Sequence, residues 1–181
     1  MDWYRARPDS QASVQLLVVD DNFADVQMLV ETFEQLRMGC DICLVPDALH
    51  AIECLSRKDM WSSAMHPTLI LVDLYLPRLS GHEFLIEIRR RPEFENVLVA
   101  LWTGLCSPQA IEAAYEYGAQ MCLTKPHSLQ GWVQLAESLA GIMAQPRCNM
   151  STPARNRPAS RLSSPGGYLR HCLEVCSQTT E

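Results

Sequence analysis

Residues 69–85 read LILVDLYLPRLSGHEFL, and this stretch decides the fold. Its first four residues, Leu69–Val72, form an unbroken apolar run, which is typical of a strand buried on both faces of a sheet. Asp73 ends the run, and Gly81 lies in the turn before a helix marked by apolar residues at helical spacing: Phe84, Leu85 and Ile88. The stretch therefore predicts a strand, a polar turn and a helix in succession.

The same alternation extends to both sides of this stretch. Further strands are predicted at Val14–Val19, Cys40–Val45, Val97–Trp102 and Gln120–Leu123. Apolar residues at helical spacing follow each of them, beginning at Phe23, Ala48, Ile111 and Leu129. Five strands alternating with five helices predict an α/β fold with a doubly wound parallel sheet covered by helices on both faces.

The ends of the chain differ in composition from this regular part. Residues 1–12 are predicted to be a flexible leader, and residues 13–144 the folded domain. Residues 145–181 are rich in Pro, Ser, Arg and Asn, so we expect a disordered tail. Residues 168–176 could form two helical turns at most, which is too short for an output domain, so we expect none in the tail.

The charge, the apolar runs and the cysteines of the chain argue against several classes of protein. A net charge of −6 argues against a broad surface for DNA or anionic membranes. No apolar run approaches the roughly 20 residues that span a bilayer. The eight cysteines are scattered. Cys40 and Cys43 form a CxxC pair, but residues three apart on a strand point to opposite faces, which argues against a metal or redox site. We therefore expect reduced thiols in a cytoplasmic protein.

Polar residues stand where the predicted strands end. The carboxyl ends of parallel strands meet at one edge of the sheet, so these residues should converge there. They are Asp20, Asp21, Asp73, Thr103 and Lys125. Asp20 and Asp21 could instead simply cap the first helix together with Asn22.

Three clustered carboxylates repel one another, at a cost on the order of 4 kcal/mol per pair at 4 Å and an effective dielectric constant near 20. A divalent cation relieves this repulsion, and Mg²⁺ suits a site of carboxylates, waters and phosphate oxygens. A carboxylate beside Mg²⁺, a hydroxyl and a lysine is suited to phosphoryl transfer, in which aspartate can be the nucleophile. The constellation therefore predicts an aspartyl-phosphate site.

Four segments carry a resemblance to the receiver domains of two-component response regulators. They read VVDDNFADVQML, LILVDLYLPRLSGHEFL, VALWTG and CLTKP. The resemblance covers roughly residues 14–144 and implies a flavodoxin-like sheet of strand order 2-1-3-4-5. The DDNxADV opening is most similar to the small regulators paired with phytochrome-type histidine kinases.

The resemblance also implies roles for individual residues. Asp73 would accept the phosphoryl group, and Thr103 and Lys125 would contact it. Mg²⁺ would be held by carboxylates and by one backbone carbonyl: Asp20, Asp21, Asp73 and the carbonyl of Tyr75.

The function expected from the resemblance is that of a single-domain response regulator, phosphorylated by a histidine kinase, that signals by binding a protein partner. It would catalyse only its own phosphorylation and dephosphorylation. Homodimers would form through the fourth helix, fifth strand and fifth helix, near Tyr115, Tyr117 and Gln130. One alternative is a Mg²⁺-dependent aspartyl-phosphate phosphohydrolase, although no carboxylate stands two residues after Asp73. Another is an unphosphorylated interaction module.

Two positions depart from the family pattern. Cys122 stands where receivers usually carry an aromatic switch residue, three positions before Lys125. Tyr75 stands two positions after Asp73, where a small or polar residue is frequent. A phenol ring there, flanked by Leu105, is expected to exclude the water that hydrolyses an aspartyl-phosphate; alternatively, the ring turns outward toward a partner.

Overall fold

The computed structural model describes residues 2–5, 15–56, 67–105 and 107–144. Five parallel strands form the centre of the sheet: β2 (Gln15–Val19), β3 (Asp41–Val45), β4 (Leu69–Val72), β5 (Leu98–Thr103) and β6 (Met121–Thr124). Their order is β3-β2-β4-β5-β6, which is the 2-1-3-4-5 order of the flavodoxin-like fold. The predicted fold class is therefore confirmed.

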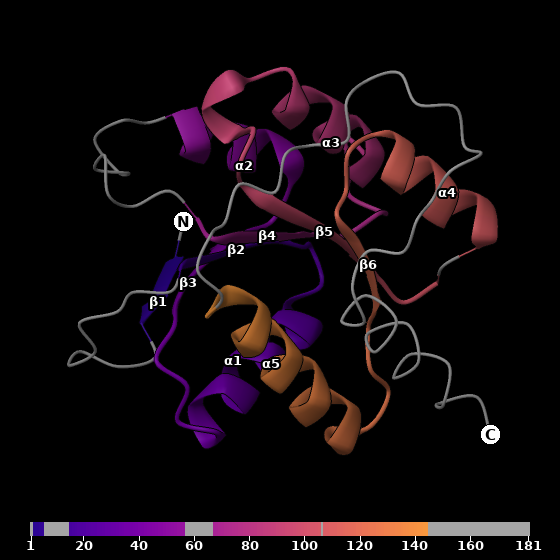
Figure 1. Ribbon diagram of the computed structural model, residues 1–181. Helices are drawn as coiled ribbons and strands as arrows, with labels where there is room; N and C mark the ends of the chain where they lie inside the picture. The colour runs from indigo at the N-terminus through magenta and orange to yellow at the C-terminus, as the bar shows by residue number, and fades with distance from the viewer. Residues whose placement is uncertain (1, 6–14, 57–66, 106, 145–181) are drawn as a thin grey trace.

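In the described part of the chain, five α-helices cover the two faces of the sheet (Figure 1). One face carries α1 (Phe23–Gln35) and α5 (Leu129–Met143); the other carries α2 (Ala48–Ser56), α3 (Gly81–Arg89) and α4 (Pro108–Glu116). Alternate residues of each central strand point into the two resulting cores, as the pleat requires. All four residues of β4 are buried, as expected for a strand covered on both faces.

The leader differs from its prediction at four residues. Asp2–Arg5 forms a further strand, β1, which pairs antiparallel with β3. The pairing forms because the outer edge of β3 offers backbone groups that an extended segment can bond. The rest of the leader and the predicted tail, residues 145–181, lie outside the described residues.

The cysteines of the described part behave as the strand pattern predicts. Cys40 and Cys43 belong to the cores on opposite faces of the sheet, and both thiols are buried and free. Burial raises the pKa of Cys40 to about 12, so its reactive thiolate form is disfavoured. The CxxC pair is therefore part of the packing.

A half-buried arginine fixes the end of the sheet opposite to the strands' carboxyl ends. Arg89, the last residue of α3, donates hydrogen bonds to the backbone carbonyls of Phe94, Val97 and Gly118. It also donates to the side-chain oxygen of Gln120 at 2.7 Å. One guanidinium group thus joins α3 to the segments that enter β5 and β6.

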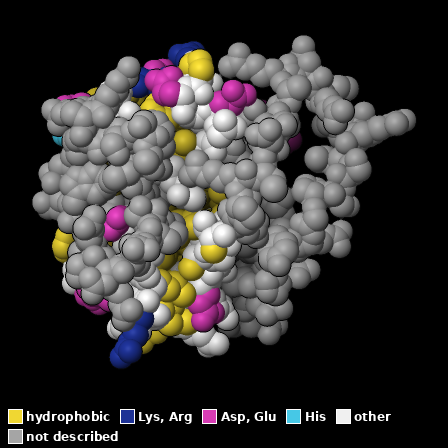
Figure 2. Space-filling view, turned by 60° about the vertical axis from the view of Figure 1, so that its left-hand side comes forward, with side chains coloured by type: hydrophobic (Ala, Val, Ile, Leu, Met, Phe, Trp, Pro, Cys, Tyr) yellow, Lys and Arg dark blue, Asp and Glu magenta, His cyan; other side chains and the backbone are white. Residues whose placement is uncertain are grey.

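Figure 2 shows one side of the molecule, where hydrophobic and acidic side chains lie close together. In this view the visible Lys and Arg side chains lie at the upper and lower edges.

Among the described residues, no helix is both long and apolar enough to cross a membrane.

Candidate functional site

The first strand of the parallel sheet, β2, ends at the acidic pair. Asp20 is buried and accepts a hydrogen bond from the backbone N–H of Asn22 at 2.9 Å. Asn22 is the residue that caps α1, accepting from the N–H of Ala24. Asp21 is exposed. The capping alternative therefore applies to Asn22, which leaves the carboxylates of Asp20 and Asp21 available for other contacts.

Asp73 follows β4 and is also buried, with 7% of its surface exposed. Its backbone N–H donates to the carbonyl of Val19 at 2.9 Å, which fixes it beside the end of β2. Its Oδ1 accepts from the N–H of Tyr75 at 3.2 Å. Gly81 packs directly behind this residue, since a Cβ at position 81 would lie 2.3 Å from the Asp73 carbonyl oxygen. The backbone therefore places the Asp73 side chain at the carboxyl edge of the sheet.

Lys125, just after β6, joins the separate strand ends. Its Nζ lies 2.7 Å from Oδ2 of Asp20, 2.7 Å from Oδ2 of Asp73 and 3.1 Å from Oδ2 of Asp25. Its backbone N–H donates to the carbonyl of Thr103 at 3.0 Å. Thr103 is itself buried, and its hydroxyl lies 3.4 Å from the carbonyl oxygen of Leu105. The ends of β2, β4 and β6 thus contribute side chains to one compact polar cluster, and the end of β5 is joined to it through the backbone of Thr103.

An aromatic ring supports the ammonium group of Lys125. The Nζ lies 5.0 Å from the centroid of the Trp102 ring, within the range of a cation–π contact. Trp102 is fully buried and packs edge-on against Trp132 of α5. The lysine is therefore held between a ring and three carboxylates.

Burial and ion pairing act in opposite directions on the pKa values of Asp20 and Lys125. Burial raises the pKa of Asp20 to about 6, although Lys125 acts to lower it. Burial also acts to lower the pKa of Lys125, but its contacts with Asp20 and Asp73 outweigh burial and hold that pKa above its ordinary value. The lysine is therefore charged at neutral pH, and its positive charge opposes the effect of burial on Asp20.

The three aspartates have the composition of a divalent-cation site. One carboxylate oxygen from each of Asp20, Asp21 and Asp73 lies within 4.8 Å of the others. Hard carboxylate oxygens on partly exposed and buried side chains, with room for water on the Asp21 side, suit Mg²⁺. The donor set therefore fits the predicted ion.

The structure brings together the side chains predicted to converge, and it adds two that were not predicted. Asp20, Asp21, Asp73 and Lys125 form the cluster, while Thr103 ends the adjoining strand. Tyr75 lies in the following loop, with 65% of its surface exposed. Asp25 and Trp102 are the additions. The signal for Asp25 is its place in the first turn of a helix that begins at the carboxyl edge of the sheet.

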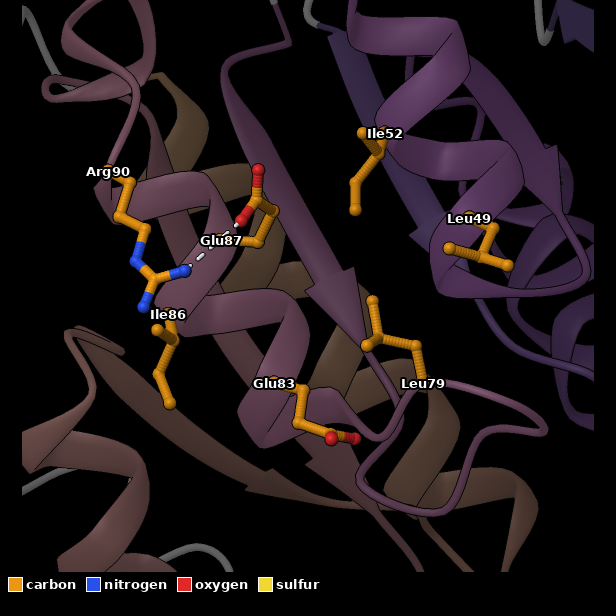
Figure 3. Close-up of a pocket in the computed structure, with 7 residues that line it drawn as sticks. All are labelled: Leu49, Ile52, Leu79, Glu83, Ile86, Glu87 and Arg90. Carbon is orange, nitrogen blue, oxygen red and sulfur yellow. Dashed lines mark ion pairs between the residues drawn. The ribbon is translucent and has the colours of Figure 1, made fainter.

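A groove of about 520 Å³ lies between α2 and α3, and none of the clustered residues lines it (Figure 3). Its walls are apolar residues of both helices and of the loop before α3, together with Glu83, Glu87 and Arg90. Glu83 accepts hydrogen bonds from Ser80, and Glu87 forms an ion pair with Arg90. The acidic groups of the groove are thus paired within the groove and its border, and they are separate from the aspartate cluster.

Comparisons with known proteins agree with this geometry. The model of the response regulator receiver domain family matches residues 16–137. Response regulator Rcp1 of Synechocystis is 27% identical over 124 residues, which cover 68% of this chain and 84% of that protein. Two-component response regulator ARR17 of Arabidopsis thaliana is 27% identical over 66% of this chain and 80% of its own length.

Solved structures show the same similarity. The phosphorylated cyanobacterial phytochrome response regulator RcpA is 26% identical, with a TM-score of 0.63 over 71% of this chain and 91% of that chain. The Mn²⁺-bound form of Rcp1 is also 26% identical, with a TM-score of 0.60 over 69% of this chain and 90% of that chain. Since the family model spans more than half of the sequence and the sheet has the corresponding strand order, this chain belongs to the response regulator receiver domain family of two-component signalling.

Proposed function

We propose that Asp73 accepts a phosphoryl group from a histidine kinase in the presence of Mg²⁺, and that the phosphorylated protein signals by binding a protein partner. The observation that carries this proposal is the buried Asp73 carboxylate, which lies 2.7 Å from the Lys125 ammonium and within 4.8 Å of the Asp20 and Asp21 oxygens. Its test is phosphorylation with acetyl phosphate and Mg²⁺, followed by intact mass.

Each residue of the site has its own role in the proposed phosphoryl transfer. A carboxylate oxygen of Asp73 forms a bond to phosphorus while the bond from phosphorus to the donor's imidazole nitrogen breaks, and the imidazole keeps that electron pair. Asp20, Asp21, Asp73 and the Tyr75 carbonyl would hold Mg²⁺, which neutralises charge on the transferred oxygens. Lys125 pairs with one of these oxygens, and the Thr103 hydroxyl donates to another.

The proposed donor is a histidine kinase of the phytochrome type. This proposal rests on the similarity to RcpA, which is named a phytochrome response regulator. The proposed partner surface is the face of α4, β6 and α5, where Tyr115 and Tyr117 are exposed. This face is also where we propose that two copies associate.

We predict that Mg²⁺ stabilises the unphosphorylated protein, because a bound cation removes the repulsion among three carboxylates. The free energy of unfolding should rise by about 2.7 kcal/mol at a Mg²⁺ concentration one hundred times Kd. Thermal melting with and without the ion measures this gain, and Asp21→Ala should lose most of it. If millimolar Mg²⁺ did not change the melting temperature of the wild type, the proposed Mg²⁺ ligands would be contradicted.

We also predict that Tyr75 prolongs the life of the phosphorylated state by limiting access of water to phosphorus. Dephosphorylation of Tyr75→Asn should be faster than that of wild type by a factor on the order of three to ten, since about 1 kcal/mol in the barrier is a factor of this size. Decay is followed by intact mass at equal Mg²⁺. The alternative is a role in partner binding, with which the exposed ring is compatible. Equal decay rates of the two proteins would contradict the exclusion of water by Tyr75.

A further inference from the structure

Asp25 brings a third carboxylate to Lys125, from a helix rather than from a strand end. It lies in the first turn of α1, and its Oδ2 is 3.1 Å from the Lys125 Nζ. The same oxygen accepts a hydrogen bond from the side-chain amide of Asn22 at 2.8 Å. Asn22 in turn caps α1, so the carboxylate is held in place at the helix N-terminus.

Three carboxylate oxygens surround the ammonium group at 2.7, 2.7 and 3.1 Å. An ammonium group has one N–H for each of these oxygens. The side chain of Lys125 is 8% exposed, so little water reaches it. A phosphoryl oxygen can therefore pair with Nζ only when one of the existing contacts is lengthened or replaced.

Phosphorylation would affect the three carboxylate contacts of Lys125 differently. One oxygen of Asp73 becomes bonded to phosphorus, and Asp20 belongs to the group whose oxygens could share a cation. Asp25 is outside that group among the described residues. Its negative charge thus stays directed at Lys125, while the phosphoryl group brings further negative charge to the same ammonium.

We propose that Asp25 is a positioning residue that restrains phosphorylation by holding Lys125 toward α1 and away from the incoming phosphoryl group. The proposal rests on the proposed phosphorylation of Asp73. Two effects act in the same direction: Asp25 competes for the ammonium, and its charge repels the phosphoryl oxygens. Asp25 thus sets how readily the site accepts its phosphoryl group.

A purely structural role for Asp25 makes a different prediction. A carboxylate in the first helical turn stabilises the helix through its dipole, and its loss would lower stability without changing the rate of phosphorylation. Asn is nearly the same shape as Asp, and its side-chain oxygen can still accept the hydrogen bond from Asn22. Asp25→Asn therefore removes the charge and preserves the local geometry.

The experiment compares initial rates of phosphorylation by acetyl phosphate at saturating Mg²⁺, followed by intact mass. Three variants are compared with wild type: Asp25→Asn, Asp25→Glu and Glu34→Gln. Asp25→Glu keeps the charge beside Lys125, and Glu34→Gln removes one charge from an exposed position of the same helix. We expect Asp25→Asn to react roughly three- to tenfold faster, the size of effect of one partly buried charge contact, and the other two to react like wild type.

The outcomes separate this proposal from the function on which it rests. Failure of the wild type to gain a phosphoryl group would overturn the proposed function. With wild type phosphorylated, an Asp25→Asn rate equal to or below the wild-type rate would overturn the restraint. A rate of Asp25→Glu as high as that of Asp25→Asn would overturn it as well, because the charge would then not be the cause.

Discussion

Replacing Asp73 by Asn should abolish the uptake of a phosphoryl group from acetyl phosphate. The Asn side chain is neutral and too weakly nucleophilic to attack phosphorus, yet it has nearly the same shape and can still accept from Lys125. The loss of one buried charge also relieves repulsion with Asp20 and Asp21, so the fold should persist. Intact mass measures the uptake, and thermal melting checks the fold.

The control for this experiment is Glu34→Gln, which removes a carboxylate from an exposed position on α1 and should leave uptake unchanged. If Asp73→Asn gained a phosphoryl group as readily as wild type, another residue would be the acceptor. Loss of uptake in the variant, with an unchanged melting transition, would establish that Asp73 is required.

The largest effect on stability is expected for Arg89→Met. The substitution leaves the carbonyls of Phe94, Val97 and Gly118 without their side-chain donor. It also removes one donor from the side-chain oxygen of Gln120, which keeps its hydrogen bond from the Val99 N–H. Each acceptor that loses a charged donor lowers the free energy of unfolding by about 1–3 kcal/mol. Water can replace part of the lost hydrogen bonding, so we expect a total loss of about 3–5 kcal/mol in the free energy of unfolding. Urea denaturation measures it.

The neighbouring residue provides a matched control for Arg89. Arg90 is mostly exposed, and its ion pair with Glu87 spans 3.6 Å. Arg90→Met should therefore change the unfolding free energy by less than about 1 kcal/mol, as is usual for surface pairs. Similar losses for the two variants would mean that the hydrogen bonds of Arg89 contribute little.

The strands of the parallel sheet were predictable from sequence because they depend on local patterns, whereas their order was implied by the resemblance to receiver domains. Apolar runs such as Leu69–Val72 indicate buried strands, and the positions of Asp20, Asp73 and Lys125 after such runs predict a common edge. β1 was missed because Asp2–Arg5 has no strand-like apolar run, and its pairing depends on the free edge of β3. Its partner is distant in sequence, so no local signal reveals the pairing.

The contacts within the site could be predicted only in part. Strand ends fix which residues meet, but the direction of a side chain also depends on how a helix sits on the sheet. Asp25 and Lys125 meet because α1 begins at the carboxyl edge of the sheet and the long side chain of Lys125 extends from the end of β6 toward the end of β2. The position of α1 over the sheet results from packing in the core that it shares with α5. The sequence also indicates a buried Trp102 without indicating that its ring lies beside the ammonium.

The contact between Trp102 and Lys125 makes the fluorescence of Trp102 sensitive to the position of the Lys125 ammonium group. Indole emission responds to the electric field of a nearby charge, and the Lys125 Nζ lies 5.0 Å from the Trp102 ring. Trp102 is fully buried, so solvent contributes little to its spectrum. Any event that moves the ammonium group away from the ring will therefore change the emission of this indole. Because the chain has three other tryptophans, a variant in which Trp3, Trp61 and Trp132 are replaced by Phe lets the fluorescence of Trp102 follow the lysine in real time.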